Sequence, residues 1–385
     1  MLKTFVQKLK NFDFLLLLLC SALTVIGIIS IYSADEQLAV HQFRGFIGGF
    51  VLAVIVAFFD HRFILKFYIV MYLLNIVLLV MVLTMGISSH NAQRWLNIAG
   101  IQFQPAEMSK LLLILFYAAF IMKNKERMKN IIFDLVCVVL ILPPIFLVYR
   151  QPDLSTSIML ATIFISIMFI GGISSQLVVA MSAMAVVAVP VLFYLALIPD
   201  SPIVRPFQQR RILAWLHPEE YAMTEAYQTM NSLMAIGSGQ LHGKGFDTNE
   251  MSSVLSGGYI SESQTDFIFT IIGEEFGFIG ACSVILLILG IAIDCFIIAA
   301  RANDLGGRLI ATGMAVWIGF QGFLNIGVAT GVMPNTGIPL PFVSSGLTSL
   351  WSIYIGIGCV LSVRMRQDDP HWAVIHRDEL LDMKL

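Results

Sequence analysis

Charged residues are scarce in this sequence. Asp, Glu, Lys and Arg make up 12% of its 385 residues, about half the fraction found in an ordinary soluble domain. Hydrophobic residues make up 58%, and the mean hydropathy is +0.84. An apolar excess this large has no water-facing surface to occupy, so the sequence predicts a chain that lies mostly in lipid.

Strong net charge and patterned cysteines are lacking too. The net charge of −2 excludes a strongly basic nucleic-acid-binding protein, so we expect no nucleic-acid partner. The five cysteines fall inside apolar runs without a C-x-x-C pair, and we interpret them as small core residues. The seven histidines have no metal-ligand spacing, so we expect no structural metal site.

The sequence predicts an all-α polytopic membrane protein with ten transmembrane helices. Polar or Gly/Pro-rich segments separate ten apolar runs, at 14–33, 45–59, 63–86, 106–122, 131–149, 154–171, 176–198, 267–299, 309–330 and 347–364. The first run follows a basic start that resembles a signal sequence. Its length of about 20 residues and the lack of a small-residue cleavage site favour an uncleaved helix.

Lysine and arginine fall mostly in one set of loops, which the positive-inside rule places in the cytoplasm. Both termini are then cytoplasmic, with 365–385 as a tail, in a single membrane domain over 1–385. The extracellular side holds one large loop, 199–265, and two shorter segments of specialised sequence, 87–105 and 333–346. Long loops in compact domains are usually functional, so we expect the chemistry on the outer face.

Asp266 is the sharpest candidate for that chemistry, because it stands where the large loop enters the eighth span. A straight helix over 267–299 would be about 50 Å long, well beyond a hydrocarbon core of about 30 Å, so its polar start should overhang on the outer side. Thr270, Gly273 and Gly277 would share the face of this carboxylate and leave room for a ligand. The alternative is that Asp266 caps its helix, which is the commoner use of such a residue.

Two shorter segments also carry charged residues at predicted helix starts. In QPAEMSK, Pro105 suits a helix start, and Glu107 and Lys110 would be neighbours on one face. An ion pair at the outer end of a span is often functional, but it could equally orient the helix at the interface. In RQPDLST, Asp153 follows a proline turn, and the residues alone favour a role at the helix start.

The large loop contains the cations best placed to hold a pyrophosphate, Arg210, Arg211 and Lys244. The glycines of GSGQLHGKG could let the backbone approach a phosphate, although tight turns explain them better. Glu262, just before Asp266, and Glu275, near the predicted membrane boundary, complete the candidate substrate-binding residues.

Several segments resemble the hallmark stretches of the SEDS family, which contains the bacterial shape, elongation, division and sporulation proteins RodA, FtsW and SpoVE. They are NAQRWLNIAGIQFQPAEMSK, QPDLST, RRILAWLHPEEYAMTEAYQTMNSLMAIGSGQLHGKG, and SESQTDFIFTIIGEE followed by NIGVATGVMPNTGIPLPFVSSG. They occur in the family's order through nearly the whole chain. The GIPLPF segment is more similar to RodA or SpoVE than to typical FtsW.

The resemblance implies a ten-span fold with an outward-facing site, in the cytoplasmic membrane of a bacterium. It implies peptidoglycan glycosyltransferase activity on lipid II, with a class B penicillin-binding protein as partner. The family's catalytic aspartate falls on Asp266, and its conserved polar positions in and after the fourth span fall on Glu107, Lys110 and Asp153. The sequence departs from the family at Gln264, where histidine is common, and at SSGLTS, where Ser-Tyr-Gly-Gly-Ser is usual.

These observations lead to the hypothesis of an inverting lipid II polymerase in which Asp266 is the general base. No cofactor is certain, although a divalent cation such as Mg²⁺ or Mn²⁺ could help the cations stabilise the leaving pyrophosphate. One alternative is a lipid II flippase, which would need a polar path across the membrane, for which Asn75, Gln321 and Asn325 are the candidates. Another is a non-catalytic scaffold of the elongation or division machinery.

Overall fold

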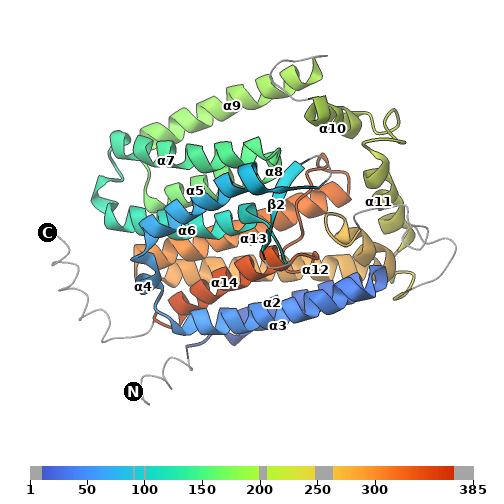
Figure 1. Cartoon of the computed structure of the whole chain (residues 1–385), viewed down its shortest axis with the longest axis horizontal. Helices are drawn as coiled ribbons and strands as arrows, with labels where there is room; N and C mark the ends of the chain where they lie inside the picture. Colours follow the sequence, from blue (N-terminus) through green and yellow to red (C-terminus); the bar gives the residue numbers. More distant parts are fainter. Residues whose placement is uncertain (1–10, 90–91, 99–100, 199–205, 248–262, 368–385) are drawn as a thin grey trace.

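The structure is a computed structural model that describes residues 11–89, 92–98, 101–198, 206–247 and 263–367. Glu262 and parts of the large loop and of the tail therefore lie outside the described residues. Long helices run side by side in a bundle, and a small sheet lies at one end of it (Figure 1).

The elements follow one another without a second domain of different architecture in the described part of the chain. The first are α2 (Phe14–Ala34), α3 (Glu36–Phe58), α4 (His61–Leu65), α5 (Tyr68–Met85), β1 (Ile87–Ser89), β2 (Ala92–Ile98), β3 (Ile101–Phe103), α6 (Pro105–Lys123), the 3-10 turn η1 (Lys125–Arg127), α7 (Ile131–Arg150), α8 (Leu154–Gly171) and α9 (Ser175–Leu197). The rest are α10 (Pro206–Leu216), α11 (Tyr227–Ser238), α12 (Ile268–Arg301), α13 (Leu305–Ala329) and α14 (Leu347–Arg364).

Nine helices among the described residues are long and apolar enough to cross a membrane, which confirms an all-helical polytopic protein. They are α2, α3, α5, α6, α7, α8, α12, α13 and α14. Helix α9, with 23 residues, occupies the expected run 176–198. The count of ten spans and the sides of the two termini stay predictions.

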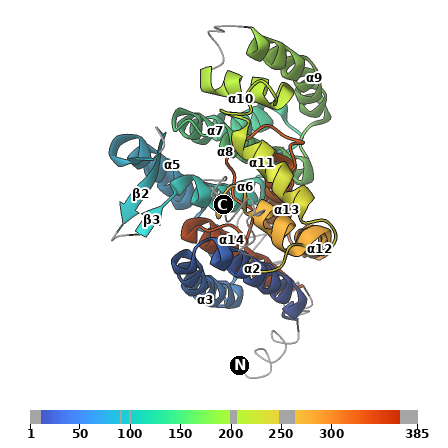
Figure 2. The ribbon, with the colours of Figure 1, turned by 90° about the vertical axis from the view of Figure 1, so that its right-hand side faces the viewer.

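Helix α6 lies at the centre of the bundle, with α13 and α14 beside it (Figure 2). The apolar stretch of α6 is 83% buried, against 17% for that of α5, whose apolar side chains face outward. The lipid-facing helices therefore surround a core in which buried polar side chains must find partners within the protein.

The two ends of the bundle differ in what they carry. Strand β2 pairs antiparallel with β1 and β3, and this sheet lies at the same end as α10 and α11 (Figure 1). We call this end the outer end and the opposite end, which carries α4, the inner end, after their predicted sides. The described parts of the large loop are folded: α10 precedes a series of turns, and α11 begins at Tyr227.

Helix α12 is not the straight helix that its apolar run predicts. It breaks at Gly277, which has φ 63° and ψ −159°, a conformation that only glycine adopts readily. The segment 240–245 that follows α11 lies against the break and satisfies the backbone groups that the break releases. The four hydrogen bonds run from Lys244 N to Glu274 O, from Gly245 N to Glu275 O, from Phe278 N to Gln240 O and from Ile279 N to Leu241 O.

Candidate active site

Asp266 lies at the outer end, in the turn before α12, and is half-buried. Its backbone is held from two sides. The Asn325 side chain, on α13, donates hydrogen bonds to the carbonyl oxygens of Asp266 (2.7 Å) and Ile338 (2.8 Å), and the hydroxyl of Ser344 donates to the carbonyl of Thr265 (2.6 Å). The carboxylate therefore stands on a backbone that α13 and the segment 333–346 fix in place.

The segment 333–346 also approaches the carboxylate itself. Gly337 has φ +66°, and a Cβ on it would lie 3.2 Å from Oδ2 of Asp266. The next turn of the segment is tied down by Gln321, whose amide donates to the carbonyl of Pro339 (2.8 Å). A glycine at 337 thus lets one wall of the site come close to the acidic group.

Two expectations for Asp266 are wrong. The N-cap residue of α12 is Phe267, so Asp266 does not occupy the capping position. The small-residue face that was expected to leave room for a ligand is filled by the chain itself. The Thr270 hydroxyl lies 2.5 Å from that of Ser232 on α11, and a Cβ on Gly273 would lie 2.8 Å from the Ile236 side chain.

Arg211 is the large-loop cation that the structure brings to this place. It is half-buried on α10, and its Nη1 donates to the carbonyl of Asn335, 3.3 Å away. Burial lowers the pKa of Arg211, the positive charge of Arg94 lowers it further, and the carboxylates of Asp266 and Asp153 act in the opposite direction. The charges of two arginines and two aspartates therefore act on one another at the outer end.

Asp153 and Arg94 complete this group. Oδ1 of Asp153 accepts a hydrogen bond from the N–H of Thr156 (3.0 Å), which confirms the role at the start of α8 that the residues alone favoured. Arg94, on β2, donates from Nε to the carbonyl of Gln151 (3.3 Å) and from Nη2 to that of Pro152. Sequence reasoning missed Arg94, because no local pattern links a strand residue to a distant turn.

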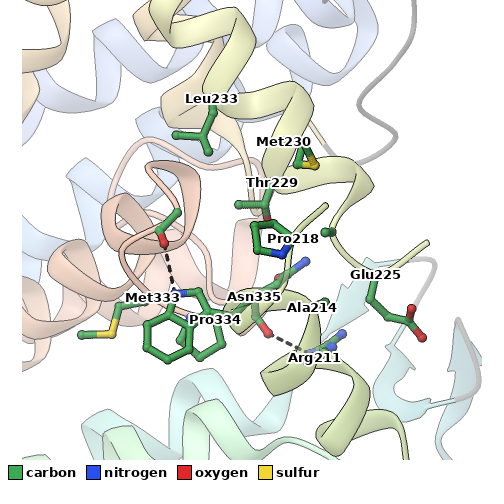
Figure 3. A pocket seen from close by; sticks show the side chains of 13 residues that line it. Arg211, Ala214, Pro218, Glu225, Thr229, Met230, Leu233, Met333, Pro334 and Asn335 are labelled. Carbon is green, nitrogen blue, oxygen red and sulfur yellow. Dashed lines mark hydrogen bonds between the residues drawn. The ribbon is translucent and has the colours of Figure 1, made fainter. Parts of the chain in front are cut away.

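A pocket of about 70 Å³ lies beside Arg211, between α10, α11 and the residues after α13 (Figure 3). Trp215 forms part of its wall and donates from Nε1 to the carbonyl of Gly331 (3.0 Å). Met230, Leu233 and Pro334 make most of the remaining wall apolar. The guanidinium of Arg211 is thus held between an apolar pocket and the segment that contacts Asp266.

Glu107 and Lys110 form the expected ion pair, but inside the bundle rather than at an interface. Their exposed fractions are 2% and 0%, and Nζ of Lys110 lies 2.6 Å from Oε1 of Glu107. Lys110 also donates to Oε1 of Gln321 (2.7 Å), which accepts a further bond from Trp317 (2.7 Å). Since Gln321 also binds Pro339, this buried pair is connected to the site through one amide side chain.

The remaining candidate residues lie elsewhere. Lys244 pairs with Glu274 on α12 (2.8 Å), and Oε1 of Glu275 accepts hydrogen bonds from Ser33 and from the N–H of Asp247 (3.3 Å). Arg210 is 67% exposed and lies 3.6 Å from Glu225. Of the candidate residues, the structure therefore brings together Asp266, Asp153 and Arg211, and it places Arg210 and Lys244 apart from them.

The glycines near Lys244 serve close packing of backbone against backbone. A Cβ on Gly239 would lie 1.9 Å from the carbonyl oxygen of Gly273, and one on Gly243 would lie 2.0 Å from that of Glu275. Their small size is thus explained by the break in α12. Among the described residues, no three His, Cys, Asp or Glu side chains are grouped so that they could hold a metal ion.

The polar residues proposed for a path across the membrane have other roles. Gln321 and Asn325 belong to the last turns of α13 at the outer end, where both hold backbone carbonyls. Asn75 lies within α5 and is 1% exposed, and neither of its side-chain polar atoms has a partner in the described part of the chain. These three residues therefore do not line up as a polar path.

Comparison with known proteins gives a consistent result. The profile of the FtsW, RodA and SpoVE family, described as "Cell cycle protein", matches residues 7–369. Peptidoglycan glycosyltransferase MrdB of Escherichia coli is 32% identical over 367 residues, which cover 94% of this chain and 95% of MrdB. The probable peptidoglycan glycosyltransferase FtsW of Geobacter sulfurreducens is 29% identical over 375 residues, 94% of this chain and 97% of that protein.

Solved structures show the same likeness. The crystal structure of the rod shape determining protein RodA of Thermus thermophilus superposes with a TM-score of 0.68 at 26% identity, covering 93% of this chain and 98% of that one. A chain from a structure on the coordination of polymerization and crosslinking by a peptidoglycan synthase complex gives a TM-score of 0.76 at 28% identity, covering 93% and 99%.

Proposed function

Because the chain belongs to the FtsW, RodA and SpoVE family and is a multi-pass membrane peptidoglycan glycosyltransferase, we propose that it polymerises lipid II into glycan strands on the outer face of the membrane. In this proposal Asp266 is the general base, and the bundle crosses the membrane ten times with both termini in the cytoplasm. Lipid II is an undecaprenyl-diphosphate-linked sugar, so its tail would lie along the apolar helices.

The observation that carries the proposal is that neighbouring segments hold Asp266 in place while its side chain stays partly exposed. A general base must be held within hydrogen-bond reach of the proton that it accepts and must remain accessible to substrate. The Asp266 carboxylate is half-buried, its backbone is held by Asn325 on α13, and Gly337 lets a neighbouring segment approach it. Among the candidate carboxylates that the structure describes, Glu107, Asp153 and Glu275 are buried and do not combine this support with exposure.

The reaction is a displacement at the anomeric carbon of the donor. A sugar hydroxyl of the acceptor loses its proton to Asp266 as its oxygen bonds to that carbon, and the bond from the carbon to the diphosphate oxygen breaks. The diphosphate departs with the bonding electrons, and its developing negative charge is stabilised by a cation such as Arg211. A single displacement inverts the anomeric centre, so an α-linked donor gives a β-linked strand.

The other candidate residues take different places in this proposal. The position of Arg211 supports it as a substrate-binding residue, whereas Arg210 faces solvent and Lys244 is paired with Glu274. Glu107 and Lys110 would act through the segment at Pro339, and Asp153 through the turn at the start of α8. A divalent cation could also share the charge of the diphosphate.

A partner follows from one of the structural relatives. One similar chain comes from a structure on the coordination of polymerization and crosslinking by a peptidoglycan synthase complex. Crosslinking is catalysed by a transpeptidase. We therefore propose that a class B penicillin-binding protein is the partner of this chain.

The test is polymerisation of labelled lipid II by the purified protein, with and without a class B penicillin-binding protein. The parent should make strands that a muramidase specific for β-linked glycan cleaves. Asp266→Ala should make none while unfolding at the parent's temperature. Strands formed by Asp266→Ala at the parent's rate, or strands that resist the muramidase, would contradict the proposal.

A further inference from the structure

We propose that Arg94 and Arg211 form a two-guanidinium anion site that takes the diphosphate group of a lipid-linked sugar. Arg94 is the new member of the site, on β2 of the small sheet. The inference rests on the proposed function, because it assigns a subsite to the same reaction.

The two arginines belong to one connected frame. Arg94 holds the carbonyls of Gln151 and Pro152, and Arg211 holds that of Asn335. These two backbone segments are joined directly, because the hydroxyl of Ser155 donates to the carbonyl of Thr336 at 2.6 Å. The sheet, the start of α8, the segment 333–346 and α10 thus fix both guanidinium groups at the outer end.

Arg94 donates both of its described hydrogen bonds to uncharged groups. The acceptors are the carbonyls of Gln151 and Pro152, which accept from Nε and Nη2. A carbonyl accepts a hydrogen bond without neutralising the donor, so Arg94 remains a half-buried cation. Its charge, after burial, is the largest cause of the lowered pKa of Arg211. Two cations that disfavour each other in this way are stabilised when an anion binds to both.

The chemistry of the pair favours a diphosphate over a single phosphate. Each guanidinium is a planar fork that can hold phosphoryl oxygens bidentately, and a diphosphate offers two phosphoryl groups. The buried hydroxyl of Thr336 has no partner among the described residues and is a further donor on the segment next to Arg211.

The position of the pair also suits the leaving group. Asn335, which Arg211 contacts, is two residues from Gly337, which approaches Asp266. Two residues of chain span at most about 7 Å. Asp266 and Arg211 therefore meet one short segment at neighbouring points, as a displacement with a base at one side and a diphosphate at the other requires.

Arg210 provides a matched control on the same helix. It precedes Arg211 in the sequence, but it is 67% exposed and pairs with Glu225 at the surface. An effect of overall charge would appear in Arg210→Gln as well as in Arg211→Gln, whereas loss of the anion site would appear only in Arg94→Gln and Arg211→Gln. Arg94→Lys keeps the charge but loses the fork, and it should bind with intermediate affinity.

The experiment measures binding of inorganic pyrophosphate to the purified full chain in nanodiscs of phosphatidylcholine. We expect Arg94→Gln and Arg211→Gln to raise the Kd at least about tenfold each, Arg210→Gln to leave it within about twofold, and inorganic phosphate to bind at least about tenfold more weakly than pyrophosphate. Undecaprenyl diphosphate should displace pyrophosphate, whereas nanodiscs containing phosphatidylglycerol should leave the Kd unchanged.

Three results would overturn the inference. One is an unchanged Kd in Arg94→Gln, which would leave Arg94 a role in holding the turn at 151–152. The second is an equal rise of the Kd in Arg210→Gln. The third is displacement by phosphatidylglycerol, which would make the site one for membrane phospholipids.

Binding of pyrophosphate does not require turnover, so the inference and the proposed function can fail separately. If Arg94→Gln and Arg211→Gln lose pyrophosphate while Asp266→Ala still polymerises lipid II, the anion site stands and the assignment of the base fails. If Asp266→Ala is inactive while both arginine variants bind pyrophosphate like the parent, the anion site fails and the base stands.

Discussion

Charged side chains gather at both ends of the bundle, but they are arranged differently. At the inner end, Oδ2 of Asp304 lies 3.1 Å from Nε2 of His61 and also accepts from Arg62, while Oδ1 accepts from the N–H of Gly307 at the start of α13. Arg366, which is 5% exposed, lies 3.4 Å from a carboxylate oxygen of Asp60. Acid and base pair directly there, and the helices are tied to one another.

At the outer end, both arginines donate hydrogen bonds to backbone carbonyls. Arg94 and Arg211 hold the segments beside Asp153 and Asp266, and the carboxylate of Asp266 stays half-exposed. At the inner end the charged side chains pair with one another and hold the helices together. At the outer end the backbone holds the charged side chains in position. The same residue types thus stabilise one end and, in the proposed function, bind a ligand at the other.

The buried pair of Lys110 and Glu107 is the strongest exception to this contrast, because acid and base pair directly inside the bundle near its outer end. Lys110→Met should lower the free energy of unfolding by about 3–5 kcal/mol, since Glu107 would remain as an uncompensated buried charge. Thermal unfolding in detergent measures this. The double variant Lys110→Met/Glu107→Gln should recover part of the loss, and a fully stable single variant would contradict a structural pair.

Asn325 tests whether the outer end depends on backbone support, because its two hydrogen bonds hold the backbone at Asp266 and Ile338. Asn325→Leu should slow polymerisation by about 10- to 100-fold, because a small displacement of a catalytic group is enough for such a loss. Asn75→Leu is the matched control, since that buried amide has no partner among the described residues. It should retain activity. Equal losses in the two variants would show that Asn325 acts only through packing.

Gly337 tests the close approach to the carboxylate. Gly337→Ala adds a Cβ at 3.2 Å from Oδ2 of Asp266, and the alanine must adopt the left-handed backbone that glycine has there. We expect turnover to fall about tenfold and the free energy of unfolding to fall by about 1–2 kcal/mol. Gly172→Ala has the same backbone problem at φ +91° with nothing within 4 Å. It should lose stability and keep its turnover per folded molecule. If both variants turn over alike, the approach to Asp266 does not matter.

Asp304 tests the inner end through pH. Burial would raise the pKa of Asp304, but hydrogen bonding and the charges of His61 and Arg62 hold it well below its usual value. A depressed carboxyl pKa contributes stability that is present above the usual value of about 4 and is lost as the pH falls below it. Asp304→Asn should therefore cost about 1 kcal/mol at neutral pH, since Asn still caps a helix, and less in acid. A difference that grows toward low pH would contradict this.

The spans could be predicted from the sequence because lipid demands long apolar runs. The starts of α6 at Pro105 and of α8 after Asp153 were predictable too, since proline and aspartate act locally there. The break at Gly277 was not, because it depends on the segment 240–245, whose backbone replaces the lost helical bonds. A glycine inside an apolar run looks the same whether the helix continues or ends.

The site was predictable only in part. Asp266 and Arg211 could be named, one from its position and family resemblance and the other as an outer cation. Their support could not, because Asn325 and Gly337 act on Asp266 through contacts that are distant in sequence. Arg94 was missed for the same reason, whereas Arg210 and Lys244, equally basic, lie apart from the group.

Neutralising one aspartate at each end, in one polymerisation assay, tests the central contrast most directly. Asp266→Asn should slow lipid II polymerisation per folded molecule by at least about 100-fold and leave the unfolding temperature unchanged. Asp304→Asn should lower the unfolding temperature and polymerise at the parent's rate per folded molecule. An Asp266→Asn protein that polymerises as fast as the parent would contradict the account.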